Sequence, residues 1–468
     1  MEFLASVSAL WHIFARWPFA RLSRFLRRLP FRVVAPSALT YTPASKSVAN
    51  LSGNTVEDFV GSSGPLSVPA PQGTLVISEF RLRGAAGAND EFIELYNNSN
   101  APITVSTNDG SLGWAVAASD GAPRFIIPNL TVIPARGHYL AANTNATGGY
   151  SLSNYGGANA AAPDVTYTAD IPDDSGLTIF STSDPNNFTE AYRLDSVGFT
   201  GAPNVLAREG AGLAPLGANN VEFAYVRKQT SGSPQDTGDN VQDFALVSTT
   251  AAVINGVQSQ LGAPGPENLA GGVLQRNATV KASLVDFQCT GTSVNPASGC
   301  ARVRVVTPDP GEPTNSTLGT LKLRRKFTNT TGGTITRLRF RVVDITTLNS
   351  PGFVSGGGSQ ADLRLINSSD STITLTDLSM TTLKGTTRET PPTQSNGGGL
   401  NSSMALTVPV VIAPGSSVNV EFNLGVMQGG NYRILHQRRV GHVQPGCADQ
   451  CAEGWNNEGQ PGKQRARQ

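Results

Sequence analysis

The chain has 468 residues and a net charge of +1 at pH 7. At about 100–200 residues per domain, this length allows two to four domains. Gly (50) and Pro (30) are frequent and only 15% of residues are charged, which disfavours coiled coils and long helices. No stretch of about 18 apolar residues is present, so no conventional membrane-spanning helix is expected. The composition therefore predicts a loop-rich, all-β chain.

Residues 1–72 are expected to be a basic leader followed by a Pro/Ser-rich linker. No acidic residue lies between Phe3 and Val56, and arginines crowd the first 32 residues. An apolar stripe at helical spacing is formed by Leu22, Phe25, Leu26 and Leu29. Three interpretations stay open: an interfacial helix on an anionic membrane, a degenerate export signal, and upstream sequence included through a wrong start codon. Membrane contact is expected only through residues 1–32.

Residues 73–261 alternate like a series of short strands separated by turn signals, which is typical of a β-sandwich or barrel. This segment is acidic, with a net charge of −11 when counted to residue 268. The expected strands are Thr74–Arg83, Glu91–Tyr96, Trp114–Ala117, Arg124–Ile127, Thr131–Ile133, His138–Ala141, Gly176–Phe180, Arg193–Phe199 and Glu222–Val226.

Four motifs in this segment occur in an order that resembles one known family. They are Leu75-Val-Ile-Ser-Glu79, Asn89-Asp-Glu-Phe-Ile-Glu-Leu-Tyr-Asn97 followed by Trp114, Ile133-Pro-Ala-Arg-Gly-His-Tyr-Leu140, and Leu261-Gly-Ala-Pro-Gly-Pro266. Over about residues 73–268 they resemble the bacterial lamin-tail domain family. The resemblance implies an immunoglobulin-like sandwich, of a kind often attached to secreted or surface proteins and sometimes found beside hydrolase modules. Arg136 and the Gly/Asn/Ala-rich stretch 143–162 depart from the family pattern.

Candidate chemical groups in this segment are few. Its carboxylates gather early in the chain (Glu79, Asp90, Glu91 and Glu94) and again near its middle (Asp170, Asp173 and Asp174). Acidic loops can bind Ca²⁺, but no D-x-[DN]-x-[DN]-G loop occurs, so solvated carboxylates are the favoured interpretation and no metal ligand is assigned. His138 is the only histidine between His12 and His436, and we expect a partly exposed structural side chain. No catalytic residue and no cofactor is assigned.

Residues 262–272 are predicted to be a linker, because they are rich in Gly and Pro. Residues 273–436 then alternate again and are basic, with a net charge of +6. The expected strands are Thr279–Phe287, Ala301–Val306, Leu318–Asn329, Thr334–Ile345, Ala361–Ile366, Ser371–Leu375, Met404–Val411 and Val418–Leu424. We expect a second sandwich, immunoglobulin-like or fibronectin-like. The chain would thus hold two immunoglobulin-like β-sandwiches in tandem, with disordered N-terminal and C-terminal segments, the latter being residues 437–468.

Basic residues in the second sandwich fall at every other position of its predicted strands, so each set shares one face. If the strands are neighbours, as the turn at 330–333 suggests for two of them, the sets form one anion-binding face. The residues are Arg302, Arg304, Lys322, Arg324, Lys326, Arg337, Arg339 and Arg341. An anionic polysaccharide, a lipid headgroup, nucleic acid or the acidic first domain could occupy it. Nucleic acid is disfavoured because the face has no interleaved aromatics. A solvated outer face is the competing interpretation.

Cys289 and Cys300 bracket a Gly/Ser-rich loop between two expected strands. A disulfide here would close about ten residues, contribute roughly 2–3 kcal/mol and indicate an oxidising compartment. Two buried thiols are the alternative. In the tail, His442, Cys447 and Cys451 fall short of four zinc ligands.

These expectations converge on a non-enzymatic, extracytoplasmic binding or structural module, displayed on or secreted from a bacterial cell. Its partner would be an anionic polysaccharide or another surface protein. Two alternatives remain: an accessory or degenerate domain of a secreted hydrolase, and an intracellular lamin-like scaffold. The acidic balance of residues 73–268 argues against binding of that segment to DNA, which requires cations.

Overall fold

The computed structural model describes residues 72–157, 159–230, 233–275 and 279–442, and every described residue belongs to one compact unit. The described chain is nearly all β, as the composition predicts, and its helices are single turns. None of these helices is long and apolar enough to cross a membrane. Residues 1–71 and 443–468, which include the expected leader and most of the expected tail, lie outside the described residues.

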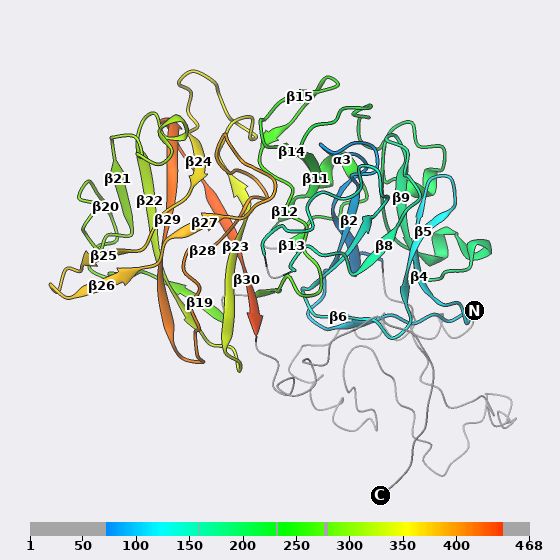
Figure 1. Ribbon diagram of the computed structural model, residues 1–468, viewed down its shortest axis with the longest axis horizontal. Helices are drawn as coiled ribbons and strands as arrows, with labels where there is room; N and C mark the ends of the chain where they lie inside the picture. Colours follow the sequence, from blue (N-terminus) through cyan, green and yellow to red (C-terminus); the bar gives the residue numbers. More distant parts are fainter. Residues whose placement is uncertain (1–71, 158, 231–232, 276–278, 443–468) are drawn as a thin grey trace, which may run out of the picture. The chain divides into compact units, whose positions relative to one another are not determined.

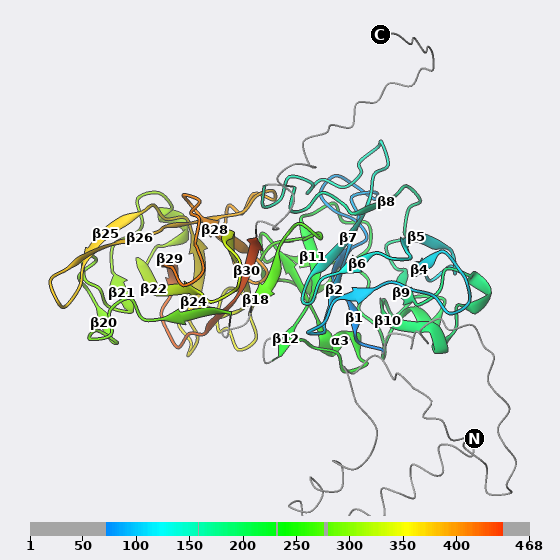
Figure 2. The same cartoon turned by 90° about the horizontal axis from the view of Figure 1, so that it is seen from below.

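The strands form two groups, visible in Figures 1 and 2, which we call the N-terminal half (72–261) and the C-terminal half (273–442). A seven-stranded sheet of the N-terminal half contains, in spatial order, β17 (Gln260–Leu261), β14 (Phe244–Ser248), β11 (Phe223–Arg227), β1 (Leu75–Arg81), β2 (Phe92–Asn97), β7 (His138–Asn143) and β8 (Val165–Tyr167). A four-stranded sheet contains β10 (Arg193–Gly198), β9 (Gly176–Phe180), β4 (Gly113–Ala118) and β5 (Pro123–Pro128).

Smaller elements complete this half. Its two-stranded ribbons are β3 (Ile103–Thr104) with β6 (Val132–Ile133), β12 (Gln229–Thr230) with β13 (Ser233–Pro234), and β15 (Val253–Ile254) with β16 (Val257–Gln258). Its short helices are η3 (Pro185–Asn187), η4 (Glu190–Tyr192), η5 (Val205–Ala207) and α3 (Asn240–Asp243).

The seven-stranded sheet is buried on both faces. Ile93 and Leu95 of β2 enter the main core of this half, which includes residues from both sheets, whereas Phe92 enters a second apolar cluster. That second cluster includes Val247 and is contacted by Leu400 of the C-terminal half. Because neighbouring residues of a strand point to opposite faces, the two clusters lie on opposite sides of the sheet. All six residues of β2 are buried as a result.

The C-terminal half also has two large sheets. The first contains β18 (Val273–Gln275), β30 (Ile434–His442), β23 (Ile335–Ile345), β28 (Ser403–Leu406) and β27 (Thr386–Arg388). The second contains β20 (Thr292–Ser293), β21 (Arg302–Val305), β22 (Thr320–Asn329), β29 (Ser417–Gln428) and β24 (Asp362–Ile366), with β19 (Val280–Ser283) also paired to β22. The remaining elements are the ribbon of β25 (Ser371–Thr374) with β26 (Met380–Leu383), and η6 (Pro313–Asn315).

Long strands of both sheets supply the core of this half. On β23, Leu338, Phe340 and Val342 enter the core, as their alternation predicts. The turn at 330–333 does not close a hairpin, contrary to expectation: β22 pairs with β19, β21 and β29, whereas β23 pairs with β28 and β30. It carries the chain from one sheet to the other, so both strands keep an apolar face toward the core between them.

Strand β30 extends past residue 436, where the sequence predicted the end of the second sandwich. Residues 437–442 pair with β23, and β30 lies between β18 and β23 in its sheet. This boundary was wrong because the strand carries polar residues inside the protein, among them Arg439, which is 3% exposed.

The connecting segment, residues 262–272, joins the halves as expected but is not an exposed linker. Residues 262–268 are all buried. The backbone of Ala263 donates to the Leu400 carbonyl (3.2 Å). At Gly262 a Cβ would lie only 2.1 Å from the Leu400 carbonyl oxygen, so this contact requires glycine. The segment is therefore part of the packed structure between the two halves.

Candidate functional site

The largest set of buried charges lies between the two halves. On the N-terminal side, Glu79 of β1 and Glu94 of β2 are direct cross-strand partners, and both are 0% exposed. On the C-terminal side, Arg339 and Arg341 alternate with the core residues of β23 and so point out of its core. Glu267 of the connecting segment is also fully buried. We call these residues, together with Arg439 and Glu389, the joint network.

Arg341 is the centre of the joint network. Its guanidinium nitrogens lie 3.7 Å from Glu79 Oε2, 3.4 Å from Glu94 Oε2 and 3.5 Å from Glu267 Oε2. It also donates to the carbonyl oxygen of Gly265. Arg341 thus binds Glu79 and Glu94, which lie on neighbouring strands, and it also binds the connecting segment.

Two further arginines complete the joint network. Arg339 binds Glu267 and forms a bidentate pair with Glu389, and its guanidinium lies 5.7 Å from the centre of the Tyr155 ring. Arg439 Nε lies 3.2 Å from Glu267 Oε2. Glu267 therefore has three guanidinium groups around it, which compensate the cost of burying its charge.

The carboxyl groups of the network differ in their acidity. Burial raises the pKa of Glu79 to about 8, although Arg341 opposes the shift. Burial likewise raises the pKa of Glu94. Burial also disfavours ionisation of Glu267, but Arg341, Arg439 and Arg339 outweigh it and hold the pKa of Glu267 well below its usual range. Glu267 is therefore the permanent anion of the network.

Additional short hydrogen bonds join Glu79 and Glu94 to the rest of the protein. Glu79 accepts from the backbone of Gly265 (2.8 Å) and from the Asn401 side chain (2.9 Å). Glu94 accepts from Ser78 Oγ (2.6 Å) and from the backbone of Glu267 (2.7 Å). These bonds are shorter than the contacts of the same carboxylates with Arg341, and they give Glu79 Oε1 a donor that arginine does not supply.

His138 is buried (1% exposed), not partly exposed as the sequence suggested. Its Nε2 lies 3.9 Å from Glu94 Oε1 and its Nδ1 lies 3.6 Å from Glu267 Oε2. Burial, reinforced by Arg439, holds the pKa of His138 well below its usual range, so the imidazole is neutral at neutral pH. These three side chains could hold a metal ion, but a cation would have to compete with the arginines around Glu267. The geometry suits a charge-balanced joint better than a metal centre.

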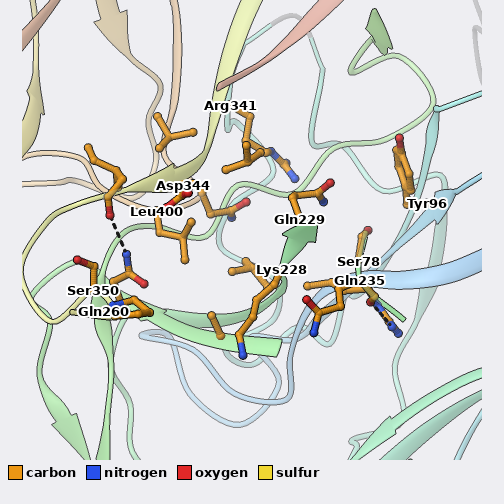
Figure 3. A pocket seen from close by; sticks show the side chains of 18 of the residues that line it. Ser78, Tyr96, Lys228, Gln229, Gln235, Gln260, Arg341, Asp344, Ser350 and Leu400 are labelled. Atoms are coloured by element: carbon orange, nitrogen blue, oxygen red, sulfur yellow. Dashed lines mark hydrogen bonds between the residues drawn. The ribbon is translucent and has the colours of Figure 1, made fainter. Parts of the chain in front are cut away.

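A cavity of about 240 Å³ opens beside the joint network. Glu94, His138 and Arg341 contribute to its lining, and Tyr96 and Gln235 from the N-terminal half are drawn around it in Figure 3. The rest of the lining combines amide and hydroxyl groups such as those of Gln229 and Ser350 with charged groups such as Lys228 and with apolar residues such as Leu400, so it does not select one chemical class of ligand.

The early acidic residues were predicted to be solvated, which is wrong. Asp90 binds Arg81 (2.5 Å), and Glu91 accepts from Asn143 Nδ2 and the backbone of Ile171 (2.8 Å each). Each carboxylate has its own buried donors, so the four residues are not one ion-binding cluster. All four are 0% exposed: Glu79, Asp90, Glu91 and Glu94.

The later acidic residues also do not form a common site. Asp173 pairs with Arg83 (2.9 Å), and the Asp170 carbonyl accepts from Arg124. The groups of three ligating side chains within the described ranges do not include Asp170, Asp173 or Asp174.

The predicted continuous basic face is not formed. Arg302 pairs in register with Leu323 and Arg304 with Leu321, whereas Lys322 pairs with Val303. Since cross-strand partners point to the same side, the arginines of β21 lie on the side of the sheet opposite to Lys322, Arg324 and Lys326. The third row, Arg337, Arg339 and Arg341, belongs to the other large sheet of this half. Of the proposed occupants, the acidic first half binds Arg341 through Glu79 and Glu94, whereas Arg339 binds Glu267 of the connecting segment and Glu389 of its own half.

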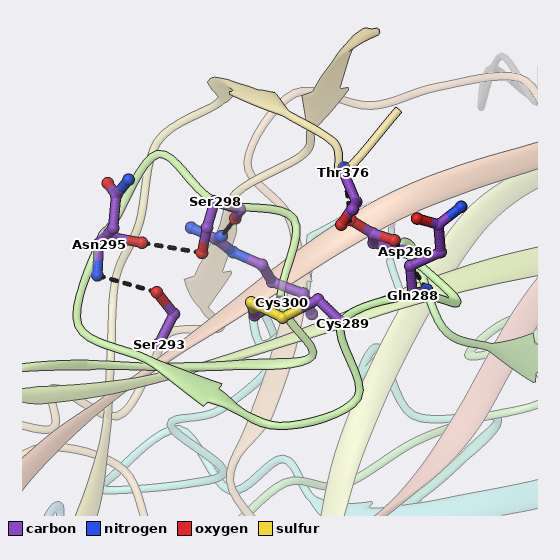
Figure 4. The surroundings of a disulfide bond; sticks show 9 residues. Asp286, Gln288, Cys289, Ser293, Asn295, Ser298, Cys300 and Thr376 are labelled. Atoms are coloured by element: carbon purple, nitrogen blue, oxygen red, sulfur yellow. Dashed lines mark hydrogen bonds between the residues drawn. A yellow bond between two sulfur atoms is a disulfide. The ribbon is translucent and has the colours of Figure 1, made fainter. Parts of the chain in front are cut away.

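Cys289 and Cys300 form a disulfide, with their Cα atoms 4.6 Å apart (Figure 4). The loop that the disulfide closes is bound to β22, because Arg324 donates to the carbonyl oxygens of Pro296 (2.6 Å) and Ser298. Arg324 also binds Glu421 of β29 (2.8 Å). The predicted disulfide and Arg324, which was expected on the basic face, thus together hold this loop against β22.

Sequence reasoning missed a second group of acidic side chains, in the N-terminal half. It consists of Asp195, Glu209 and Asp236, and one carboxylate oxygen of each lies within 4.8 Å of one oxygen of each of the other two. The residues are far apart in sequence, and no spacing motif links them.

Fold and site together define an all-β protein of β-sandwich-like character, in which a buried charge network joins two halves. Comparisons with protein-family models, with curated proteins and with solved structures found no match.

Proposed function

We propose that the protein is an extracytoplasmic, non-enzymatic structural or binding module of a bacterial cell, and that its two halves act as one rigid body. The observation that carries the proposal is the joint network. The charges that could have formed an acidic and a basic ligand surface bind each other inside the protein. Buried, mutually compensated ion pairs of this kind fix orientation more than they add stability.

The disulfide supports the location outside the cytoplasm. Disulfides persist in oxidising compartments and are rare in cytosolic proteins, where thiols are kept reduced. Because Cys289 and Cys300 close a loop that Arg324 also fixes, this disulfide serves a structural purpose.

In this proposal the N-terminal half is a lamin-tail-like, immunoglobulin-like sandwich and the C-terminal half is a second immunoglobulin-like sandwich. The motifs of the first half support the assignment through their positions. The segments with "ISE" and "EFIELYN" form β1 and β2, which pair with each other, and the segment with "HYL" begins β7, which pairs with β2. Its partner would be another surface protein or a glycan, held by surfaces other than the basic rows described above.

Cell fractionation, combined with peptide mass spectrometry of the native protein, tests the proposal. We expect the chain outside the cytoplasm, with a peptide that contains the Cys289–Cys300 crosslink. A reduced pair in a cytoplasmic chain would overturn the proposal and leave the intracellular scaffold as the alternative.

Glu94 and His138 in the cavity lining favour one second candidate, a secreted hydrolase or its degenerate relative. Purified protein should be screened against glycans, nucleic acids and esters, with His138→Gln as the comparison variant. Our proposal expects no turnover by either protein. Turnover that disappears in His138→Gln, while the circular dichroism spectrum is retained, would assign the protein to the hydrolases.

A further inference from the structure

The second acidic group lies where three segments of the N-terminal half meet. Asp195 belongs to β10, Glu209 follows η5, and Asp236 lies between β13 and α3. Glu209 and Asp236 line an opening of about 350 Å³, together with Gly73 and Gly210. Three glycines, Gly73, Gly210 and Gly238, are among the lining residues, and the backbone comes close to the carboxylates there: a Cβ on Gly73 would lie 2.7 Å from Asp236 Oδ2.

Two buried oxygen atoms of this group have no hydrogen-bond partner. Asp195 is only 2% exposed; its Oδ2 accepts from the backbone of Ile77 and from Arg227 (2.6 Å each), but its Oδ1 accepts from no donor. Glu209 Oε2 is buried and also lacks a donor. Buried carboxylate oxygens normally have partners, since an unsatisfied one costs free energy. These two atoms belong to a group whose carboxylate oxygens converge.

The charge at this place is not balanced by the protein. Three carboxylates face one guanidinium, that of Arg227, which also approaches Asp243 (3.9 Å). Arg193 and Arg208 line the opening as well, but Arg193 pairs with Glu190 and Arg208 donates to the Thr200 carbonyl. With Glu190 and Asp243 included, five carboxylates lie around three guanidinium groups, so two negative charges remain in excess when all five carboxylates are ionised.

The acidity of the group reflects this imbalance. Burial, with repulsion from Asp195 and Asp236, raises the pKa of Glu209 to about 8. Burial raises the pKa of Asp195 to about 6, against the effect of Arg227. A bound divalent cation would remove the repulsion and supply the partners that the two oxygens lack.

We propose that Asp195, Glu209 and Asp236 form a binding site for Ca²⁺. The donor set consists of oxygen atoms only, which hard cations prefer, and it has none of the His or Cys ligands typical of zinc. Ca²⁺ accepts six to eight oxygens in irregular geometry, so backbone carbonyls and water can complete the shell in the opening. Mg²⁺ fits less well because it requires near-octahedral geometry at shorter distances. The bound ion would hold together three segments of the N-terminal half.

Isothermal titration of the full-length, chelator-treated protein with CaCl₂ at pH 7.5 tests the site. We expect one saturable site with a Kd of roughly 0.1–1 mM, the range of extracellular calcium modules. Thermal unfolding should shift upward by about 2–5 °C in 10 mM CaCl₂. Binding should weaken at pH 5.5, because protons compete for the carboxylates.

The variants Glu209→Gln and Asp236→Asn should each weaken binding at least tenfold. Asp236 is exposed, so its variant is expected to fold normally and keeps the test valid if Glu209→Gln does not fold. Asp120→Asn, which changes an exposed carboxylate in the turn between β4 and β5, serves as the control and should bind like the parent. Absence of saturable binding up to 10 mM, or unchanged binding in Asp236→Asn, would overturn the site. Tighter binding of Mg²⁺ than of Ca²⁺ would overturn the choice of ion.

Discussion

Arg341→Met is the most informative perturbation of the joint network. Methionine is an unbranched apolar side chain that can follow much of the arginine's path, but it has no charge. The substitution leaves Glu79 and Glu94 buried without the guanidinium that lies 3.4–3.7 Å from them. Removing one partner of a buried ion pair typically costs 3–5 kcal/mol. Since burial already raises the pKa of both carboxyl groups, they can protonate, and we expect the lower end of that range at neutral pH.

The cost should depend on pH with a defined sign. Arg341 is the largest influence that lowers the pKa of Glu79 and Glu94, so its loss raises these pKa values further above that of an unfolded glutamate. A group whose pKa is raised in the folded state contributes stability below its unfolded pKa and loses it as pH rises through its folded pKa. Because deprotonation in the unfolded state is the same in both proteins, the deficit of Arg341→Met relative to the parent should grow as the pH rises through the folded-state pKa values of the parent, which for Glu79 is about 8.

Urea denaturation at pH 5 and pH 8 measures this deficit. Far-UV circular dichroism reports on the strands of both halves. The control is Arg302→Met, an exposed arginine that should change stability by no more than about 0.5 kcal/mol. The double variant Arg341→Met/Glu94→Gln should recover part of the loss, because coupled pairs are not additive. A deficit below about 1 kcal/mol at pH 8, or one that is larger at pH 5, would refute the reasoning.

Two other structural units give further predictions. Replacing Cys289 and Cys300 by serine should cost roughly 2–3 kcal/mol and abolish the sensitivity of the urea midpoint to dithiothreitol; an unchanged sensitivity would contradict a structural role for the disulfide. Arg324→Met should cost less than the roughly 3–5 kcal/mol of a buried charge left without any partner, because Lys322 still binds Glu421 (2.8 Å), and it should expose the disulfide loop to limited proteolysis. Burial raises the pKa of Glu91 to about 8, so its contribution to the free energy of unfolding should fall as the pH rises from about 4.5 to 8. In urea denaturation, Glu91→Gln should make the fall in stability over this pH range less steep; a steeper fall would contradict the raised pKa of Glu91.

Much of the strand pattern could be predicted from the sequence. Alternation located β1, β2, β22, β23 and β29 to within a few residues, because each has at least one apolar face in a core. It could not locate Ile434–His442, since this strand carries the polar residues Gln437 and Arg439 on buried positions. Pairing was also hidden: the short turn at 330–333 predicts a hairpin, although the flanking strands lie in different sheets.

The candidate sites show a sharper limit. The sequence showed the acidic and basic residues but treated them as surface groups, because an isolated charge is rarely buried. What buries Glu79, Glu94 and Arg341 is their mutual approach across the two halves, and residues more than 240 positions apart have no local pattern. For the same reason Asp195, Glu209 and Asp236 could not be grouped before the fold was known.

The charge segregation of the chain acquires a physical meaning in this structure. Residues 73–268 have a net charge of −11 and residues 273–436 one of +6, and part of each excess meets at the joint network. An acidic excess remains after the two are combined, and it is concentrated in the N-terminal half. The exposed part of this excess attracts cations and repels polyanions over about a Debye length, roughly 8–10 Å at physiological salt. An anionic polysaccharide is therefore a poorer partner for the N-terminal half than for the basic C-terminal strands, whereas the proposed binding of a divalent cation near Asp195 agrees with the same imbalance.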